Sequence, residues 1–137
     1  MRYLLDTNVV SEVNRPRPDV GVLNWLDQHG AGSMISEFTI GELTKGAYFL
    51  PPGKKRTSLL AWIEGLVETS ADRLLPASLE VLMRWGELCG THEAQGRRWP
   101  LADSLLAATA LVHDLIVVTR NTADFPPEVQ TLNPWKK

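Results

Sequence analysis

Residues 115–119, LIVVT, constrain the fold more than any other stretch of this sequence. Apolar and β-branched side chains follow one another there without alternating with polar ones, which is typical of a parallel strand covered on both faces. The segment just before it, LADSLLAATALVH at 101–113, is predicted to be a helix that is apolar on nearly every side. We therefore expect this helix and this strand to lie in the middle of the domain.

The remaining chain alternates short apolar strands with helices. Strands are predicted at 2–5, 33–36, within 73–77 and at 129–132, and helices at 7–14, after Asp19, and at 37–50, 54–69 and 79–95. Strands that alternate with helices predict an α/β domain with a mostly parallel sheet. A length of 137 residues corresponds to one ordinary domain with a sizeable core. We expect a single domain over residues 1–137.

The composition excludes several classes of protein. With 44% hydrophobic and 22% charged residues, the chain is predicted to be soluble and globular. Its single cysteine, Cys89, excludes an internal disulfide and a cysteine-based zinc site, and it suits a reducing compartment. We find no signal peptide and no apolar run of membrane length, so we expect a cytoplasmic protein without a membrane partner.

The net charge of −2 means that the chain as a whole is not a polycation. A nucleic-acid partner would therefore be met by local basic clusters. The candidates are Arg15 with Arg17, the run KKR at 54–56, and Arg97 with Arg98. Each cluster, taken alone, is more typical of a solvated loop or helix end.

Four carboxylates stand just after predicted strands or in the helices that follow. Asp6 ends the apolar run of YLLDTN, Glu42 lies in TIGEL, Asp103 in PLAD and Asp124 in TRNTADF. Each has an ordinary structural interpretation: Asp6 as a helix N-cap, and Glu42 in a capping box with Thr39 or on a solvated helix face. Asp103 suits the dipole at the first turn of a helix, and Asp124 suits a turn.

The joint pattern is more informative than any single acid. In a parallel α/β sheet, the carboxyl ends of the strands and the first turns of the following helices share one edge. Two carboxylates ~5 Å apart repel by roughly 3 kcal/mol at an effective dielectric constant of ~20. A cluster of three or four therefore requires a cation, or protons held by raised pKa values. Oxygen ligands without His or Cys suit Mg²⁺ or Mn²⁺, which can activate water and stabilise a phosphodiester during in-line attack.

Four of these stretches, in this order, resemble PIN-domain ribonucleases, and more closely the VapC and FitB toxins of bacterial toxin–antitoxin pairs. They are LLDTNVVSE, the TIGEL glutamate, PLADSLLAATAL and VVTRNTADF, and LPPGKKR and the closing LNPW are also similar. The resemblance implies a three-layer α/β/α fold with a central five-stranded parallel sheet. It also implies an Mg²⁺- or Mn²⁺-dependent endoribonuclease, with Asp6, Glu42 and Asp103 as the acidic core and metal ligands.

The fourth acidic position is open between two residues. Some members of the family carry Asp where this chain has Asn121, whereas here the nearby acid is Asp124. Asn121 is able to ligate through its carbonyl oxygen or to bind water. Polar residues beside the acids are expected to orient the ligands or the water, and they are Thr7, Asn8, Thr119 and Asn121.

The resemblance further implies a homodimer or a larger toxin–antitoxin assembly, held inactive by a VapB- or FitA-like antitoxin. Operator DNA would be bound only through the antitoxin. In the family, the C-terminal segment of the antitoxin lies in an apolar groove and often sends an Arg toward the acids. Trp25 and Trp62 are candidates for facing the antitoxin or the second subunit, while Trp85 is expected in the core.

Two other functions compete with this one. A phosphoryl-transfer protein with Asp6 as covalent acceptor is disfavoured, because Asn8 stands where a dehalogenase-like phosphatase needs a second Asp and no late strand ends in the Lys of a receiver domain. A catalytically silent PIN-fold binding module is opposed by the presence of Asp6, Glu42 and Asp103 together. We therefore predict an endoribonuclease toxin that hydrolyses RNA phosphodiester bonds.

Overall fold

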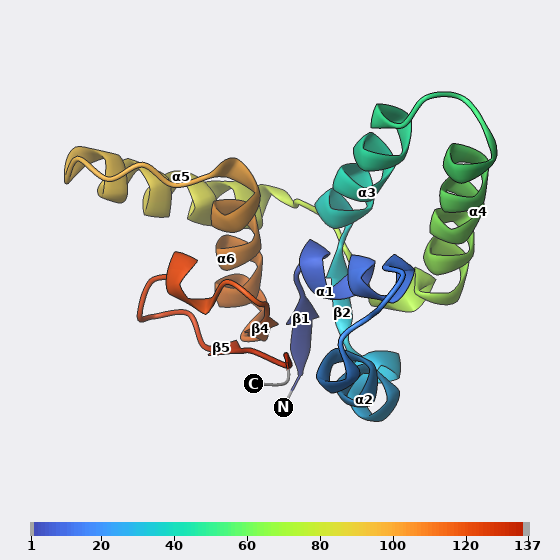
Figure 1. Ribbon diagram of the computed structural model, residues 1–137. Helices are drawn as coiled ribbons and strands as arrows, with labels where there is room; N and C mark the ends of the chain where they lie inside the picture. Colours follow the sequence, from blue (N-terminus) through green and yellow to red (C-terminus); the bar gives the residue numbers. More distant parts are fainter. Residues whose placement is uncertain (1, 136–137) are drawn as a thin grey trace.

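The computed structural model describes residues 2–135, and its centre is a sheet of five parallel strands in the order β3-β2-β1-β4-β5 (Figure 1). The strands are β1 Tyr3–Leu5, β2 Met34–Ser36, β3 Leu74–Leu75, β4 Ile116–Val118 and β5 Thr131–Leu132. Every pair of neighbours in the sheet is parallel. The predicted five-stranded parallel sheet is confirmed.

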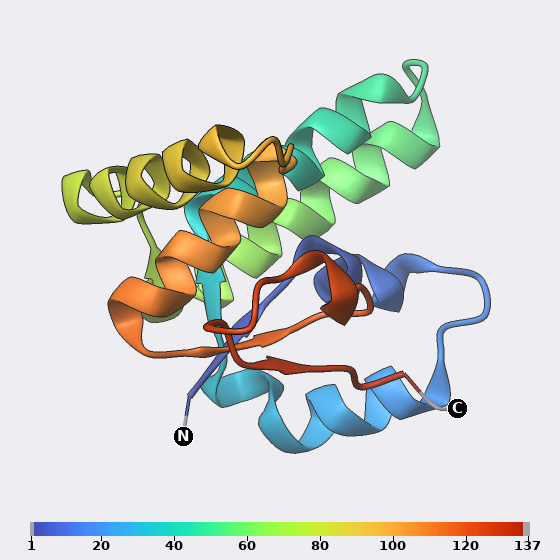
Figure 2. The same cartoon turned by 90° about the vertical axis from the view of Figure 1, so that its left-hand side faces the viewer.

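Helices alternate with the strands along the chain and cover both faces of the sheet. They are α1 Thr7–Ser11, α2 Val20–His29, α3 Glu37–Phe49, α4 Lys54–Thr69, α5 Leu79–Ala94 and α6 Leu101–His113, with 3-10 turns at Glu12–Asn14, Gly30–Gly32, Ala71–Arg73 and Thr122–Asp124. Figure 1 places α2, α3 and α4 on one side of the sheet and α5 and α6 on the other, the side that faces the viewer in Figure 2. The predicted three-layer α/β/α architecture is confirmed. None of the helices in residues 2–135 is long and apolar enough to cross a membrane.

Separate apolar clusters fill the two faces of the sheet. Successive side chains of a strand point to opposite faces. Leu5 and Val118 accordingly belong to the cluster formed with α1–α4, while Leu4 and Val117 pack against α6. Because both faces require apolar side chains, the strand at 115–119 shows no polar alternation.

Helix α6 occupies the centre of its layer. Residues 104–110 are all buried, because the sheet lies on one side of the helix and α5 packs on another through Val81 and Leu88. Ser104 is fully buried, and its hydroxyl accepts a hydrogen bond from Trp85 Nε1 at 2.9 Å and donates to Leu101 O at 2.9 Å. The predicted central position of this helix is confirmed, and Trp85 contacts the core as expected.

Helices α3 and α4 form an antiparallel pair that projects beyond the sheet (Figure 1). The PPG turn between them is closed by Arg56, whose Nε donates to Leu50 O at 3.0 Å. At the tip of the pair, Phe49 is 90% exposed. Trp25 and Trp62, the candidates for facing a partner, are half-buried and pack against the core cluster on this side of the sheet, and their contact with a partner stays a prediction.

Candidate active site

The strand order places the predicted acids at one edge of the sheet. The chain runs from β1 outward to β2 and β3, then returns to the other side of β1 for β4 and β5. Ligand sites in such sheets form at the carboxyl ends of the two strands where the order reverses. Asp6 directly follows β1 and Thr119 directly follows β4, and Asp6 N donates to Val118 O at 2.9 Å. The side chains of Asp6 and Thr119 therefore lie at the centre of the candidate site.

Asp6 has both of its carboxylate oxygens engaged. Oδ1 accepts from Thr7 N at 2.7 Å, which caps α1. Oδ2 accepts from the hydroxyl of Thr119 at 2.7 Å. The capping role and the position at the sheet edge were alternatives in the sequence, and the structure shows both at once.

Thr119 joins the ends of β1 and β4. Its hydroxyl is fully buried, donates to Asp6 and accepts from Asn121 N at 3.0 Å and from Asn8 Nδ2 at 3.5 Å. Asn8 Oδ1 in turn accepts from Arg120 N at 3.4 Å. The polar residues that the sequence placed beside the acids thus form one hydrogen-bonded network.

Glu42 reaches the site from α3. Its Oε1 accepts from the hydroxyl of Thr7 at 2.6 Å, so α3 and α1 are connected through this pair. The prediction of a capping box between Thr39 and Glu42 is wrong, because α3 begins earlier, at Glu37. Its N-cap is Ser36, whose Oγ accepts a hydrogen bond from Phe38 N at 3.1 Å. Glu42 therefore lies in the interior of the helix, facing Thr7.

The carboxylates share one electrostatic field. Burial raises the pKa of Asp6 and outweighs the hydrogen bonds from Thr119 and Thr7 that lower it, and the charge of Asp124 adds to the rise. The pKa of Asp103, in the first turn of α6, is raised to about 6, first by burial and then by repulsion from Asp6, Asp124 and Glu42. The structure thus brings the four predicted acids close enough to repel one another.

A hard divalent cation fits the chemistry of this cluster. Its donors are carboxylate oxygens with hydroxyl and amide groups around them, which Mg²⁺ and Mn²⁺ prefer. Positive charge would also remove the repulsion that raises the pKa of Asp103. Within residues 2–135, no three His, Cys, Asp or Glu side chains already lie where they would hold one ion together. Joint coordination by Asp6, Glu42 and Asp103 would therefore involve side-chain movement or bridging water.

The two candidates for the fourth acidic position, Asp124 and Asn121, act on the site through different groups. Asp124 ends the 3-10 turn after β4, and its charge raises the pKa of both Asp6 and Asp103. Asn121 contacts the network through its backbone N–H, which donates to Thr119. The backbone carbonyl of Asp124 accepts from Trp99 Nε1 at 3.1 Å, a contact that sequence reasoning missed. Its only local signal was the position of Trp99, four residues before Asp103.

A parallel α/β/α sheet with acids gathered at its switch point is the arrangement of a PIN-domain protein. The sequence model described as "PIN domain" matches residues 3–126, so the chain belongs to the PIN-domain family. Among its relatives is Toxin FitB of Neisseria gonorrhoeae, 36% identical over 135 residues, with 96% of this chain and 97% of FitB covered. VapC ribonuclease Y4jK of Sinorhizobium fredii is 35% identical over 136 residues, with 97% of each chain covered.

Solved structures agree with this placement. A FitAB structure bound to an IR36 DNA fragment superimposes with a TM-score of 0.89 at 34% identity, covering 100% of this chain and 97% of that one. The crystal structure of FitAcB from Neisseria gonorrhoeae also has a TM-score of 0.89, at 36% identity, covering 98% of this chain and 99% of the other. The family resemblance expected from the four sequence stretches is confirmed.

Proposed function

We propose that this protein is a metal-dependent endoribonuclease that acts as the toxin of a toxin–antitoxin pair. The observation that carries the proposal is the set of carboxylates at the switch point of the sheet, held by Thr7 and Thr119 and mutually repelling at Asp103. The similarity to a VapC ribonuclease and to Toxin FitB over nearly the whole chain supports it. Residues 1–137 form a single PIN domain in this proposal, working in the cytoplasm where RNA is translated.

Asp6, Glu42 and Asp103 would hold Mg²⁺ or Mn²⁺, with Asp124 or Asn121 completing the site. When bound, such a cation supplies Lewis-acid stabilisation of the phosphodiester and activates water for in-line attack. Thr119 and the Thr7 backbone fix the carboxylate of Asp6, and the Thr7 hydroxyl fixes that of Glu42. Without a cation, burial and the neighbouring carboxylates raise the pKa of Asp103 to about 6, and a bound cation would lower it by offsetting that repulsion.

The test is cleavage of total cellular RNA by the purified chain with Mg²⁺, with Mn²⁺ and with EDTA. We expect discrete cuts with metal and none with EDTA. The rate of cleavage should fall by at least about a hundredfold in Asp6→Asn and in Asp103→Asn, because each substitution removes a charged ligand. Asp27→Asn is the matched control, since Asp27 is an exposed acid on α2 away from the cluster, and it should cleave like the wild type.

Full cleavage by either site variant would contradict the mechanism. A folded wild type that binds Mn²⁺ but cuts no RNA would favour a catalytically silent binding module instead.

The partner proposed for this toxin is a VapB- or FitA-like antitoxin. A cavity of about 760 Å³ opens between α3 and the start of α6, lined by Phe38, Glu42, Tyr48, Phe49 and Leu101. An apolar segment of a partner would cover the exposed aromatic rings and end beside Glu42. Operator DNA would be reached only through the antitoxin, and the similar FitAB pair has been solved bound to an IR36 DNA fragment. The chain itself would be a homodimer or part of a larger assembly, and light scattering should give a multiple of 15.2 kDa.

A further inference from the structure

The loop between α5 and α6 presents two arginines in a cavity wall that also contains Asp124. The loop, residues 95–100, is QGRRWP, and both Arg97 and Arg98 are exposed. Its course is fixed by Gly96 N donating to Glu93 O at 3.0 Å and by Arg97 N donating to His92 O at 2.9 Å. Gly96 has φ +79, a left-handed conformation that favours glycine. The two arginines therefore project from a turn of defined conformation.

Trp99 connects this loop to the turn after β4 and to the end of α5. Its indole Nε1 donates to Asp124 O at 3.1 Å, and its ring stacks on His92 with centroids 4.7 Å apart. The same side chain thus contacts the end of α5 and the turn that carries Asp124. This anchoring holds the arginines next to the segment whose charge acts on Asp6 and Asp103.

The two guanidinium groups are available to an anion. Ion pairs among residues 2–135 join Arg15 to Glu12, Arg73 to Asp72 and Arg84 to Glu87, and none includes Arg97 or Arg98. A cavity of about 480 Å³ has both arginines and Asp124 in its wall. A neighbouring cavity of about 720 Å³ is lined by the same arginines and by Glu93, which pairs with neither of them. Arg97 and Arg98 therefore line two adjoining cavities, one of which also contains Asp124.

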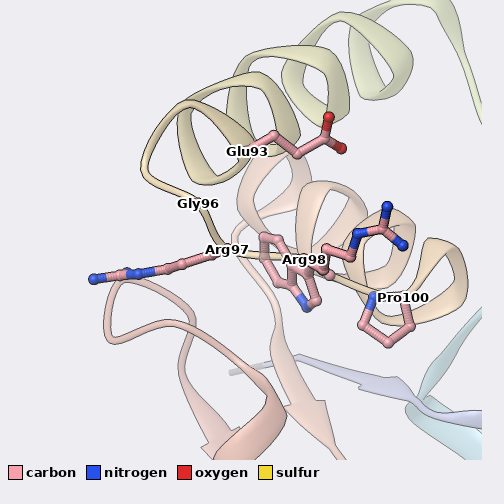
Figure 3. A pocket seen from close by; sticks show the side chains of 6 residues that line it. Glu93, Gly96, Arg97, Arg98 and Pro100 are labelled. Carbon is pink, nitrogen blue, oxygen red and sulfur yellow. The ribbon is translucent and has the colours of Figure 1, made fainter.

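The directions of the two arginine side chains favour a polymeric anion as their ligand over a single small anion. Figure 3 shows Arg97 and Arg98 leaving the loop on opposite sides, so that they point away from one another. One phosphate would not bridge two groups that diverge, whereas successive phosphates of a strand are spaced along its backbone. The acids alone would repel such a strand, and nearby cations offset that repulsion.

We propose that Arg97 and Arg98 bind backbone phosphates of the RNA strand on either side of the bond to be cleaved. The proposal rests on the proposed nuclease function and adds a positioning surface to it. Arg97 and Arg98 hold the strand so that the scissile phosphate lies at the acids. Phosphate contacts of this kind position a strand without reading its sequence.

The test measures binding by the full chain in EDTA, where metal-dependent cleavage does not occur. Fluorescence anisotropy of a labelled single-stranded RNA of about 12 nucleotides gives Kd at several salt concentrations. The variants are Arg97→Ala/Arg98→Ala, the charge-preserving Arg97→Lys/Arg98→Lys, and Lys54→Ala/Lys55→Ala. The last is the matched control, because it removes the same charge from exposed positions at the start of α4.

We expect the arginine-to-alanine variant to bind RNA about tenfold more weakly and to lower the salt slope of log Kd by about 1.4, since each single-strand phosphate contact contributes about 0.7. The lysine variant should keep most of the affinity, and the control should stay within about twofold of the wild type.

Several results would overturn the proposal. They are an unchanged Kd and slope in the arginine-to-alanine variant, an equal loss in the α4 control, or a wild type that does not bind RNA at low salt. Unchanged RNA binding with weaker binding of a polyglutamate peptide would assign the loop to an acidic protein partner instead. Failure of the nuclease function is recognised separately, because metal-dependent cleavage and its loss in Asp6→Asn are measured on chains that keep both arginines.

Discussion

At the scale of single residues, Thr119 holds the carboxylate of Asp6 at the sheet edge. Its hydroxyl has one hydrogen and two lone pairs, and all are used by Asp6, Asn121 and Asn8. The sequence predicted a polar residue at this strand end and an acid at the end of the first strand. It could not predict their contact, because that depends on the register in which Leu5 of β1 lies beside Val118 of β4.

Thr119→Val keeps the shape of the side chain and removes its hydroxyl. One buried oxygen of Asp6 then loses a hydrogen bond that lowers its pKa, so this pKa rises further. We expect metal-dependent RNA cleavage to fall by about 10- to 100-fold and its pH profile to shift upward. Steady-state cleavage between acid and alkaline pH measures both effects. Thr119→Ser restores the hydroxyl and should behave like the wild type, whereas an unshifted profile in the valine variant would exclude this role.

At the scale of elements, the helices with strong local signals were predicted best. Helices α4 and α6 have the predicted bounds, because PPG and Pro100 precede them and both carry long apolar stripes. Strands β3 and β5 are only two residues long, shorter than predicted, since each is an edge strand with a single neighbour. The helix predicted at 7–14 divides into α1 and a 3-10 turn.

That 3-10 turn carries a buried acid that no local pattern indicated. Glu12 is 5% exposed, its Oε2 accepts from Asp19 N at 2.8 Å, and its Oε1 pairs with Arg15 at 3.3 Å. The carboxylate ties the RPRP segment back against α1, the helix that bears Thr7 and Asn8. The contact between Glu12 and Asp19 depends on the path of the chain between them, so the local spacing of residues does not predict it.

Glu12→Ala removes both contacts and leaves Asp19 N without this acceptor. We expect the free energy of unfolding to fall by about 1.5–3 kcal/mol, the range for a hydrogen bond to a charged group. Urea denaturation of the metal-free protein measures it. Glu12→Gln keeps one acceptor and should cost less, and Glu68→Ala on the exposed side of α4 should change stability by less than about 0.5 kcal/mol. Equal stability of Glu12→Ala and Glu68→Ala would show that the turn does not depend on this carboxylate.

At the scale of the whole molecule, the order of the strands decides where the acids meet. The sequence predicted that strand ends and helix starts share an edge, which was enough to select Asp6, Glu42 and Asp103. It did not contain the strand order, and only that order places β4 beside β1 and brings Asp124 and the loop at 95–100 to the same edge. Gathering these charges has a cost in stability that the folded protein carries when no cation is bound.

Stability against pH makes that cost measurable. The folded pKa of Asp103, about 6, lies above its usual value of 3.8, so the folded state binds this proton more tightly than the unfolded state. The contribution of Asp103 to stability is therefore fully present below about pH 4 and is lost as pH rises through about 6. In EDTA, Asp103→Asn should be more stable than the wild type by about 1 kcal/mol at pH 8, a value reduced for the partial exposure of the group. Near pH 4 the advantage should fade.

Mn²⁺ should reverse this ranking at neutral pH. Binding to the folded state raises the Tm of the wild type, and the variant without the Asp103 charge should gain much less. Thermal unfolding of both proteins with EDTA and with Mn²⁺ gives the four values needed. Asp27→Asn, which keeps the cluster intact, should follow the wild type in both conditions. If Mn²⁺ stabilises Asp103→Asn as much as the wild type, the ion binds elsewhere, and the repulsion at Asp103 is relieved by its proton rather than by a metal.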